Sequence, residues 1–332
     1  MGGRPETARP EYADAVDAAD AVDAFDAFDA VDFVPNNGNK LLHTGNVSTA
    51  AKFPSRAGRG GATLAPTNAC PLHVPAMHRI LTTLLLTCAL LAGARADERF
   101  LRIDLERGAQ VPLLVREQAG AEATLLLLPG GNANTGPIVD GLPTSRNFLV
   151  RARAALSAER YNVVVAFKPA DLRTLELGYR RGSQHVGEIA QIVDWAQKRF
   201  GKPIWLVGTS RGTVSAAAAA AALGPRIAGV VLSSSISSSR ANSVFDTDLA
   251  AIRVPVLVMH HAQDACRNCD PAAAQRIPAA LRNAPVKKLL MIDGGANPEG
   301  DPCEALHWHG YIGYEKETAA QIAEWIRAPR GD

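Results

Sequence analysis

The chain has 332 residues, of which 47% are hydrophobic and 20% are charged, and its formal net charge is +2. These values are typical of a globular protein with a sizeable core, and they lack the excess of basic residues expected of a nucleic-acid binder. Composition changes sharply along the chain, because residues 1–96 differ in kind from the rest. The two parts therefore carry different predictions.

The first 76 residues predict no folded core. Aspartate recurs at every third position from Asp14 to Asp32, a period that fits neither a helical stripe nor strand alternation. The stretch that follows, to about Pro75, is rich in Asn, Gly, Pro and Ser without apolar periodicity, which is typical of disorder. We therefore expect residues 1–76 to be low-complexity sequence that comes from a mis-assigned upstream start of translation; an acidic tail with a function is the alternative.

Residues 77–96 have the layout of a secretory signal peptide. A short basic start precedes an apolar run over residues 80–91, and an A-x-A pattern ends at Ala96. The apolar run is too short for a permanent membrane anchor, and the threonine before Cys88 disfavours a lipoprotein signal. We therefore expect translation to start at Met77 and the mature chain, residues 97–332, to be periplasmic or secreted without a stable membrane anchor.

The mature chain predicts one domain of strands and helices. Several of its apolar runs are almost continuously hydrophobic, as in strands that are covered on both faces. Two or three strands come first and helices then alternate with strands, an order that predicts a mostly parallel sheet in three layers. The expected strands are 99–105, 111–117, 123–131, 161–169, 202–210, 227–235, 254–264 and 286–295, and the expected helices lie near 144–157, 184–200, 211–223, 271–283 and 315–327.

Three of these strands lead to residues of catalytic type. Ser210 follows the strand "IWLVGT" and stands in a G-x-S-x-G motif between Gly208 and Gly212, where strand passes into helix. Asp264 follows "VLVMHHAQ", and the last strand leads to "HWHGY", which contains His309. The motif alone fits an ordinary tight turn. Because the carboxyl ends of parallel strands meet at one edge of a sheet, however, three such residues are expected to lie together.

With this motif and the order Ser, Asp, His, the chain resembles the α/β-hydrolases, specifically the compact exported dienelactone-hydrolase-like or esterase-like kind. The resemblance covers essentially all of residues 97–332 and implies a three-layer α/β-hydrolase fold. It also implies that Ser210 is the nucleophile, that His309 is its base and that Asp264 orients the base. Gly208 and Gly212 would relieve crowding at the turn that presents the serine.

Two of the triad positions have alternatives in the sequence. His307 competes with His309, and the His-Gly-aromatic pattern of the family favours His309. Asp270 and Asp293 compete with Asp264, but Asp270 better fits the N-cap of the helix predicted near residue 271. The remaining histidines of the region are expected to be structural or to hydrogen-bond near the site: His185, His260 and His261.

The oxyanion hole of such an enzyme needs two backbone donors. One is expected to be the amide of Arg211, directly after the nucleophile. The other is expected from the sequence "LPGGNAN" at the end of an early strand, where the amide of Asn132 is the first candidate and that of Gly131 the second. The alternative for Pro-Gly-Gly is an ordinary turn.

Three cysteines remain in the mature chain: Cys266, Cys269 and Cys303. A bridge between Cys266 and Cys303 would join the loop after the acid to the loop before the histidine, and the resemblance favours Cys266 over Cys269 as the partner of Cys303. The C-x-x-C pattern of the first two has no second such pair, which disfavours a zinc site, and it lacks the context of a redox motif.

The resemblance therefore implies a serine hydrolase that cleaves small carboxylic esters, and the mechanism requires no metal or organic cofactor. About twenty residues separate "VVLSSS" from "VPVLV", where larger relatives insert a cap, so we expect an open site without a large cap domain. A peptidase or thioesterase on the same scaffold and a catalytically silent binding protein are the alternatives. The oligomeric state is not predicted.

Overall fold

The structure is a computed structural model that describes residues 97–237 and 242–331. The predictions for residues 1–76 and for the signal peptide 77–96 lie outside the described residues. Within the described part, each of the eight predicted apolar runs forms a strand of one sheet. The predicted mostly parallel α/β architecture is confirmed.

The central sheet has the strand order β1-β2-β6-β3-β7-β8-β9-β10. The pairs β1–β2 and β2–β6 are antiparallel, and all later pairs are parallel. The strands are β1 (Asp97–Asp104), β2 (Gln110–Glu117), β3 (Ala123–Leu128), β6 (Tyr161–Ala166), β7 (Ile204–Thr209), β8 (Gly229–Ser233), β9 (Val256–His261) and β10 (Lys287–Ile292). A separate small hairpin is formed by β4 (Ile138–Val139) and β5 (Leu142–Pro143).

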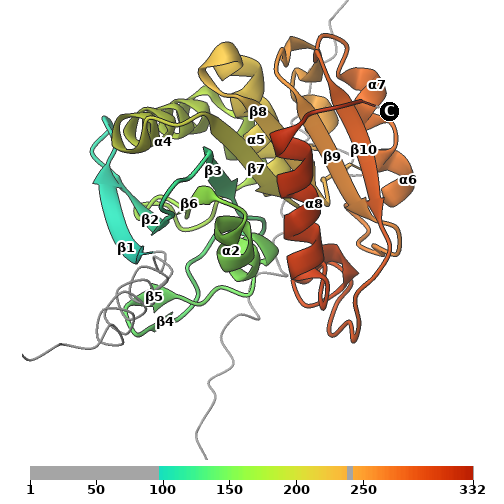
Figure 1. Cartoon of the computed structure of the whole chain (residues 1–332), viewed down its shortest axis with the longest axis horizontal. Coiled ribbons are helices and arrows are strands. Elements are labelled where there is room, and N and C mark those ends of the chain that lie inside the picture. The colour runs from blue at the N-terminus through green and yellow to red at the C-terminus, as the bar shows by residue number, and fades with distance from the viewer. Residues whose placement is uncertain (1–96, 238–241, 332) are drawn as a thin grey trace, which may run out of the picture. The chain divides into compact units, whose positions relative to one another are not determined.

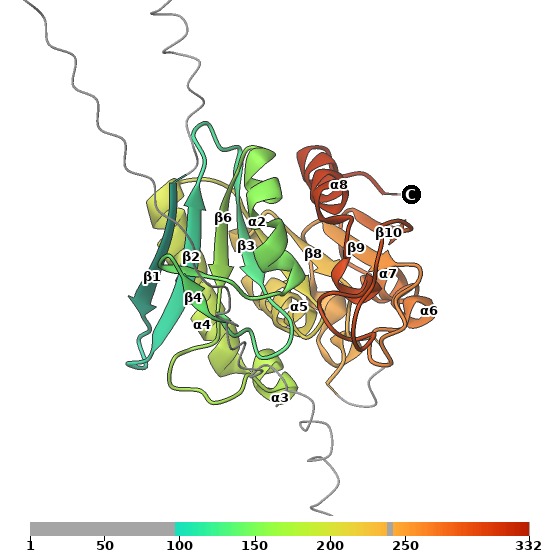
Figure 2. The same ribbon diagram turned by 90° about the horizontal axis from the view of Figure 1, so that it is seen from below.

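Alternate residues of the strands face two separate cores. In β7, Leu206 belongs to one core, whereas Trp205 and Val207 belong to the other. Helices α4 (Ser183–Phe200) and α5 (Gly212–Leu223) pack on the first core. Helices α2 (Phe148–Ala158) and α8 (Glu315–Arg327) pack on the second (Figure 1; Figure 2). Because both faces are covered, the central strands are continuously apolar, as their sequences predicted.

The helices differ from the prediction in two places. Residues 271–283 form two short helices, α6 (Pro271–Ala274) and α7 (Ile277–Ala280), instead of one. Pro278 explains the break, because proline lacks a backbone N–H and its ring clashes with the carbonyl four residues before it. The short helix α3 (Leu177–Arg181) was not predicted, since five residues are too few for a periodic signal.

The described connections at the edge where the parallel strands end are loops and turns. Between β8 and β9, the described residues form two 3-10 turns, Val244–Asp246 and Leu249–Ala251, and no large cap domain. In the described part of the chain, no helix has the length and apolar character needed to cross a membrane. The loops after β3, β7, β9 and β10 therefore define the candidate site.

Candidate active site

Ser210 stands at a sharp turn between β7 and α5. Its φ of 51° lies in the left-handed region, which residues with a side chain rarely adopt. The two motif glycines make the turn possible: a Cβ on Gly208 would lie 2.5 Å from the carbonyl oxygen of Gly212, and a Cβ on Gly212 would lie 1.9 Å from that of Leu128. Arg211 follows as the N-cap of α5, so its amide lies at the positive end of the helix dipole.

His309 and Asp264 meet although 45 residues separate them in the chain. The Nδ1 atom of His309 lies 2.9 Å from Oδ2 of Asp264, and both side chains are buried. Because a carboxylate only accepts hydrogen bonds, Nδ1 carries the proton and Nε2 is left as the basic nitrogen. The backbone N–H of Cys266 donates to Oδ1 of Asp264 at 2.9 Å, and Nε2 of His260 lies 3.3 Å from Oδ2.

These contacts shift both pKa values of the pair. Burial alone would raise the pKa of Asp264, but hydrogen bonds from His260 and His309 outweigh burial and hold that pKa below its usual range. Burial alone would lower the pKa of His309, but the sulfur of Cys269 and the carboxylate of Asp264 raise it above its ordinary value. Asp264 is therefore ionised, and His309 is a stronger base than a free imidazole.

The sequence alternatives lie in other surroundings. Asp270 caps α6 with a side-chain hydrogen bond of 2.9 Å, the role that its position predicted. Asp293 is exposed after β10, and His307 precedes a 3-10 turn. In the described structure, none of the three forms a hydrogen bond with the Asp264–His309 pair.

Cys269 belongs to the site, which the sequence analysis did not predict. Its thiol is buried and interacts with the side chains of both His309 and Ser210. Burial raises the pKa of this thiol, whereas its interactions with His309 and Ser210 lower it. Among the described residues, no hydrogen bond joins the Ser210 hydroxyl to His309. The position of Cys269, five residues after Asp264, does not indicate from the sequence that its thiol faces Ser210.

Cys266 and Cys303 form a disulfide, which confirms the predicted pairing and leaves Cys269 as a free thiol. The bond joins the loop that follows Asp264 to the loop that precedes His309. The ligand atoms of Cys266, Cys269 and His309 lie within 4.8 Å of one another. Because Cys266 is oxidised, two ligands of this group remain, fewer than a zinc site requires.

The oxyanion turn, as we name residues 130–133, follows β3. A backbone hydrogen bond of 3.0 Å closes the turn, and Gly131 adopts a φ of 53°. A Cβ on Gly130 would lie 2.7 Å from Cβ and 3.4 Å from Oγ of Ser210. The turn therefore passes directly against the serine, and the two candidate donors, the amides of Gly131 and Asn132, belong to it.

Comparison with known proteins identifies the fold. No protein-family model and no curated protein sequence matches the chain. The esterase Pf2001 of Pyrococcus furiosus is similar in structure, with a TM-score of 0.51 and 15% identity over 70% of this chain and 92% of that protein. Dienelactone hydrolase of Anabaena variabilis has a TM-score of 0.50 and 14% identity over 70% of this chain and 98% of its own. At these identities the likeness concerns the fold, and the chain has the α/β-hydrolase fold.

Proposed function

We propose that the protein is a serine hydrolase that cleaves small carboxylic esters through an acyl-enzyme on Ser210. The observation that carries the proposal is the buried 2.9 Å hydrogen bond between His309 and Asp264, formed at the sheet edge where Ser210 stands in its left-handed turn. The structural likeness to an esterase and to dienelactone hydrolase supports an ester as the substrate. The proposed chemistry uses side chains and backbone amides of the chain alone.

In the first half of the reaction, Nε2 of His309 takes the hydroxyl proton of Ser210 while Oγ attacks the ester carbonyl carbon. Asp264 holds the ring in the tautomer that leaves Nε2 basic and stabilises the imidazolium that forms. The raised pKa of His309 makes its Nε2 a stronger proton acceptor, and only the neutral ring, which predominates above that pKa, can take the proton. The carbonyl π electrons move to oxygen and give a tetrahedral oxyanion.

The oxyanion would accept hydrogen bonds from the amide of Arg211 and from an amide of the oxyanion turn. When the tetrahedral intermediate collapses, the bond to the alcohol oxygen breaks and His309 returns its proton to the leaving alcohol. Water then attacks the acyl-enzyme by the same route, with His309 as base, and releases the acid and free Ser210.

The surroundings of the site favour small substrates and an exported protein. The described residues form no large cap over the site, so a large interfacial lid is disfavoured. The Cys266–Cys303 disulfide fits an oxidising compartment. In protein from the native host we expect an N-terminus at Asp97, and a peptide from residues 1–76 would contradict the proposed start at Met77.

The test is hydrolysis of p-nitrophenyl acetate by the purified protein. Ser210→Ala and His309→Ala are each expected to lower kcat by more than about 1,000-fold. The matched control is His307→Ala, which removes a neighbouring histidine without touching Asp264 and should retain most activity. Loss of activity in His307→Ala with retention in His309→Ala would contradict the assigned base. Thioester and peptide substrates in the same assay decide between the ester and its alternatives.

A further inference from the structure

Arg180 is a buried arginine behind the oxyanion turn. It lies on α3, and its side chain is 1% exposed. Its guanidinium donates through Nη2 to the carbonyl of Gly131 at 2.8 Å, through Nη1 to the hydroxyl of Ser215 at 3.0 Å and through Nε to the carbonyl of Leu175 at 3.2 Å. An arginine stays charged in proteins, and burying a charge is costly. Such complete burial therefore calls for an explanation.

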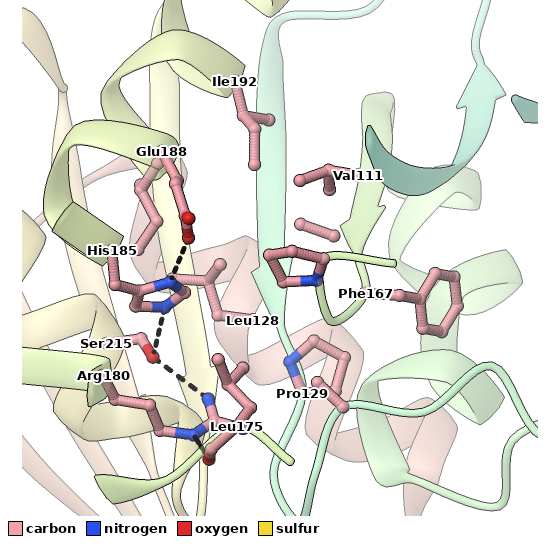
Figure 3. Close-up of a pocket in the computed structure, with 14 residues that line it drawn as sticks. Val111, Leu128, Pro129, Phe167, Leu175, Arg180, His185, Glu188, Ile192 and Ser215 are labelled. Atoms are coloured by element: carbon pink, nitrogen blue, oxygen red, sulfur yellow. Dashed lines mark hydrogen bonds and ion pairs between the residues drawn. The ribbon is translucent and has the colours of Figure 1, made fainter. Parts of the chain in front are cut away.

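A chain of directed hydrogen bonds holds this guanidinium. Figure 3 shows Ser215 between Arg180 and His185, with Glu188 on the other side of the imidazole. Nε2 of His185 lies 3.0 Å from Oγ of Ser215, and Nδ1 lies 3.0 Å from Oε2 of Glu188. Burial lowers the pKa of His185, and Arg180 lowers it further against the opposing effect of Glu188. The neutral ring donates to Glu188 and accepts from Ser215, whose oxygen accepts from Arg180.

These distances resemble those of a catalytic triad, but the surroundings exclude one at Ser215. Ser215 lies inside α5 with no exposure and lacks the left-handed turn of Ser210. The adjoining cavity is lined mainly by apolar side chains such as Val111 and Phe167, and it leaves about 20 Å³ for the centres of water molecules. That volume suits about one water, and no ester fits. Any role of this network in catalysis therefore lies in the group that Arg180 binds, the Gly131 carbonyl.

The geometry points to Arg180 as a positioning residue for the oxyanion hole. Across a planar trans peptide, the carbonyl of one residue and the N–H of the next point in opposite directions. By holding the Gly131 carbonyl on the buried side, Arg180 would fix the amide of Asn132 on the opposite side of the same peptide, where we infer the oxyanion to lie. The N–H of Leu175 donates to Oδ1 of Asn132 at 3.2 Å, so the α3 segment holds the turn at two points. This inference rests on the proposed function.

The oxyanion turn needs this restraint because of its glycines. A side chain at Gly130 would overlap Ser210, so glycine is required there. Gly131 adopts a φ of 53°, which also favours glycine. Since glycine has wide backbone freedom, the peptide after Gly131 can rotate unless its carbonyl is bound. A charged donor makes a stronger hydrogen bond than a neutral one, and a donor oriented before the reaction lowers the barrier most.

The kinetic test is Arg180→Met in the full chain, with p-nitrophenyl acetate as substrate. We expect kcat to fall by about 10- to 100-fold, less than the loss of a whole oxyanion donor, while KM stays within about threefold. The matched control is Arg153→Met, which removes an arginine of helix α2 that binds Glu98 and the Val150 carbonyl. Equal kcat in both variants would overturn the positioning role.

Two further variants test the chain of contacts and guard against failed folding. Arg180→Lys keeps the charge but lacks the forked donors, so we expect a kcat between wild type and Arg180→Met. Ser215→Ala removes one acceptor and leaves the Gly131 contact in place, so its loss should be smaller than that of Arg180→Lys. A folded Arg180→Lys with wild-type kcat and wild-type exchange at the turn would also overturn the proposal.

Hydrogen exchange tests the restraint without turnover. We expect the peptide covering residues 125–137 to exchange faster in Arg180→Met or Arg180→Lys than in wild type, and to be unchanged in Arg153→Met. Unchanged exchange in a folded Arg180 variant would contradict the restraint. If the wild type hydrolyses no ester and Ser210 forms no adduct with a fluorophosphonate, the proposed function fails by itself, and the exchange rates still decide whether Arg180 holds the turn.

Discussion

The two sides of the candidate site are held by different bonds. On the side of the base, the Cys266–Cys303 disulfide joins the acid loop to the histidine loop, and Arg151 donates to backbone carbonyls of the histidine loop at 2.9 Å and 2.8 Å. On the side of the oxyanion turn, the described contacts are hydrogen bonds from the Arg180 side chain to the Gly131 carbonyl, from the Leu175 N–H to the Asn132 side chain and from the Lys168 N–H to the Ala133 carbonyl. A covalent link therefore supports the proton-transfer groups, and a buried charge supports the amides.

This difference follows from what each side must control. A side chain such as His309 has two rotatable bonds, so its loop and its partner Asp264 must both be placed. The oxyanion turn controls a peptide plane, and one hydrogen bond to its carbonyl is enough to orient that plane. Variants on the two sides should therefore fail in different ways.

The largest expected effect on the base side comes from Asp264→Asn. The amide cannot hold His309 in the tautomer with a basic Nε2, so kcat should fall by about 10,000-fold with little change in fold. The control is Asp270→Asn, at the N-cap of α6, which should retain activity. A kcat within tenfold of wild type for Asp264→Asn would contradict the assigned acid.

Removal of the Cys266–Cys303 disulfide should lower the stability of the folded protein. Cys266→Ala/Cys303→Ala opens a link with a sequence separation of 37 residues, so we expect the free energy of unfolding to fall by about 2–4 kcal/mol. Urea unfolding measures the change. Wild type treated with a dithiol reductant should match the variant, and an unchanged midpoint in both would show that the bond contributes nothing.

Arg151→Met should loosen the histidine loop while the disulfide still holds it. We expect kcat to fall by about tenfold, below the roughly 100-fold that a displacement of about 1 Å can cost. Arg153→Met, two residues along the same helix, is the control for both arginine variants. An Arg151→Met enzyme with wild-type kcat would show that the disulfide alone positions His309.

The smallest expected effect is seen in the pH dependence of kcat/KM. Because His309 must be unprotonated to act and its pKa is raised, kcat/KM should fall as pH decreases through a midpoint above about 6.5, the ordinary histidine value. Arg180→Met lies on the other side of the site and should leave this midpoint unchanged. A wild-type midpoint at or below 6.5 would contradict the raised pKa.

Much of the fold follows from local sequence signals. Each central strand is a continuous apolar run, which is typical of strands covered on both faces. Ser210, Asp264 and His309 could be proposed because each follows a strand, and parallel strands bring those ends to one edge. The choice of Cys266 over Cys269 as the partner of Cys303 came from the family resemblance, not from the strand order.

The supporting contacts could not be predicted because they depend on packing between elements. His185 meets Ser215 across 30 residues only because α4 packs against α5, and neither position differs from an ordinary helical residue in the sequence. Arg180 lies in a helix too short to carry a periodic pattern. The direction of the Cys269 thiol depends on loop geometry, and the break at Pro278 depends on the backbone around one residue.

The most direct test of the central claim is the position of a covalent adduct. The purified protein is treated with a fluorophosphonate and digested with trypsin, which separates Ser210 from Ser215 because it cleaves after Arg211. We expect an adduct on the peptide that ends at Arg211 and its absence in Ser210→Ala. An adduct on residues 212–226, or none in folded protein, would contradict Ser210 as the nucleophile.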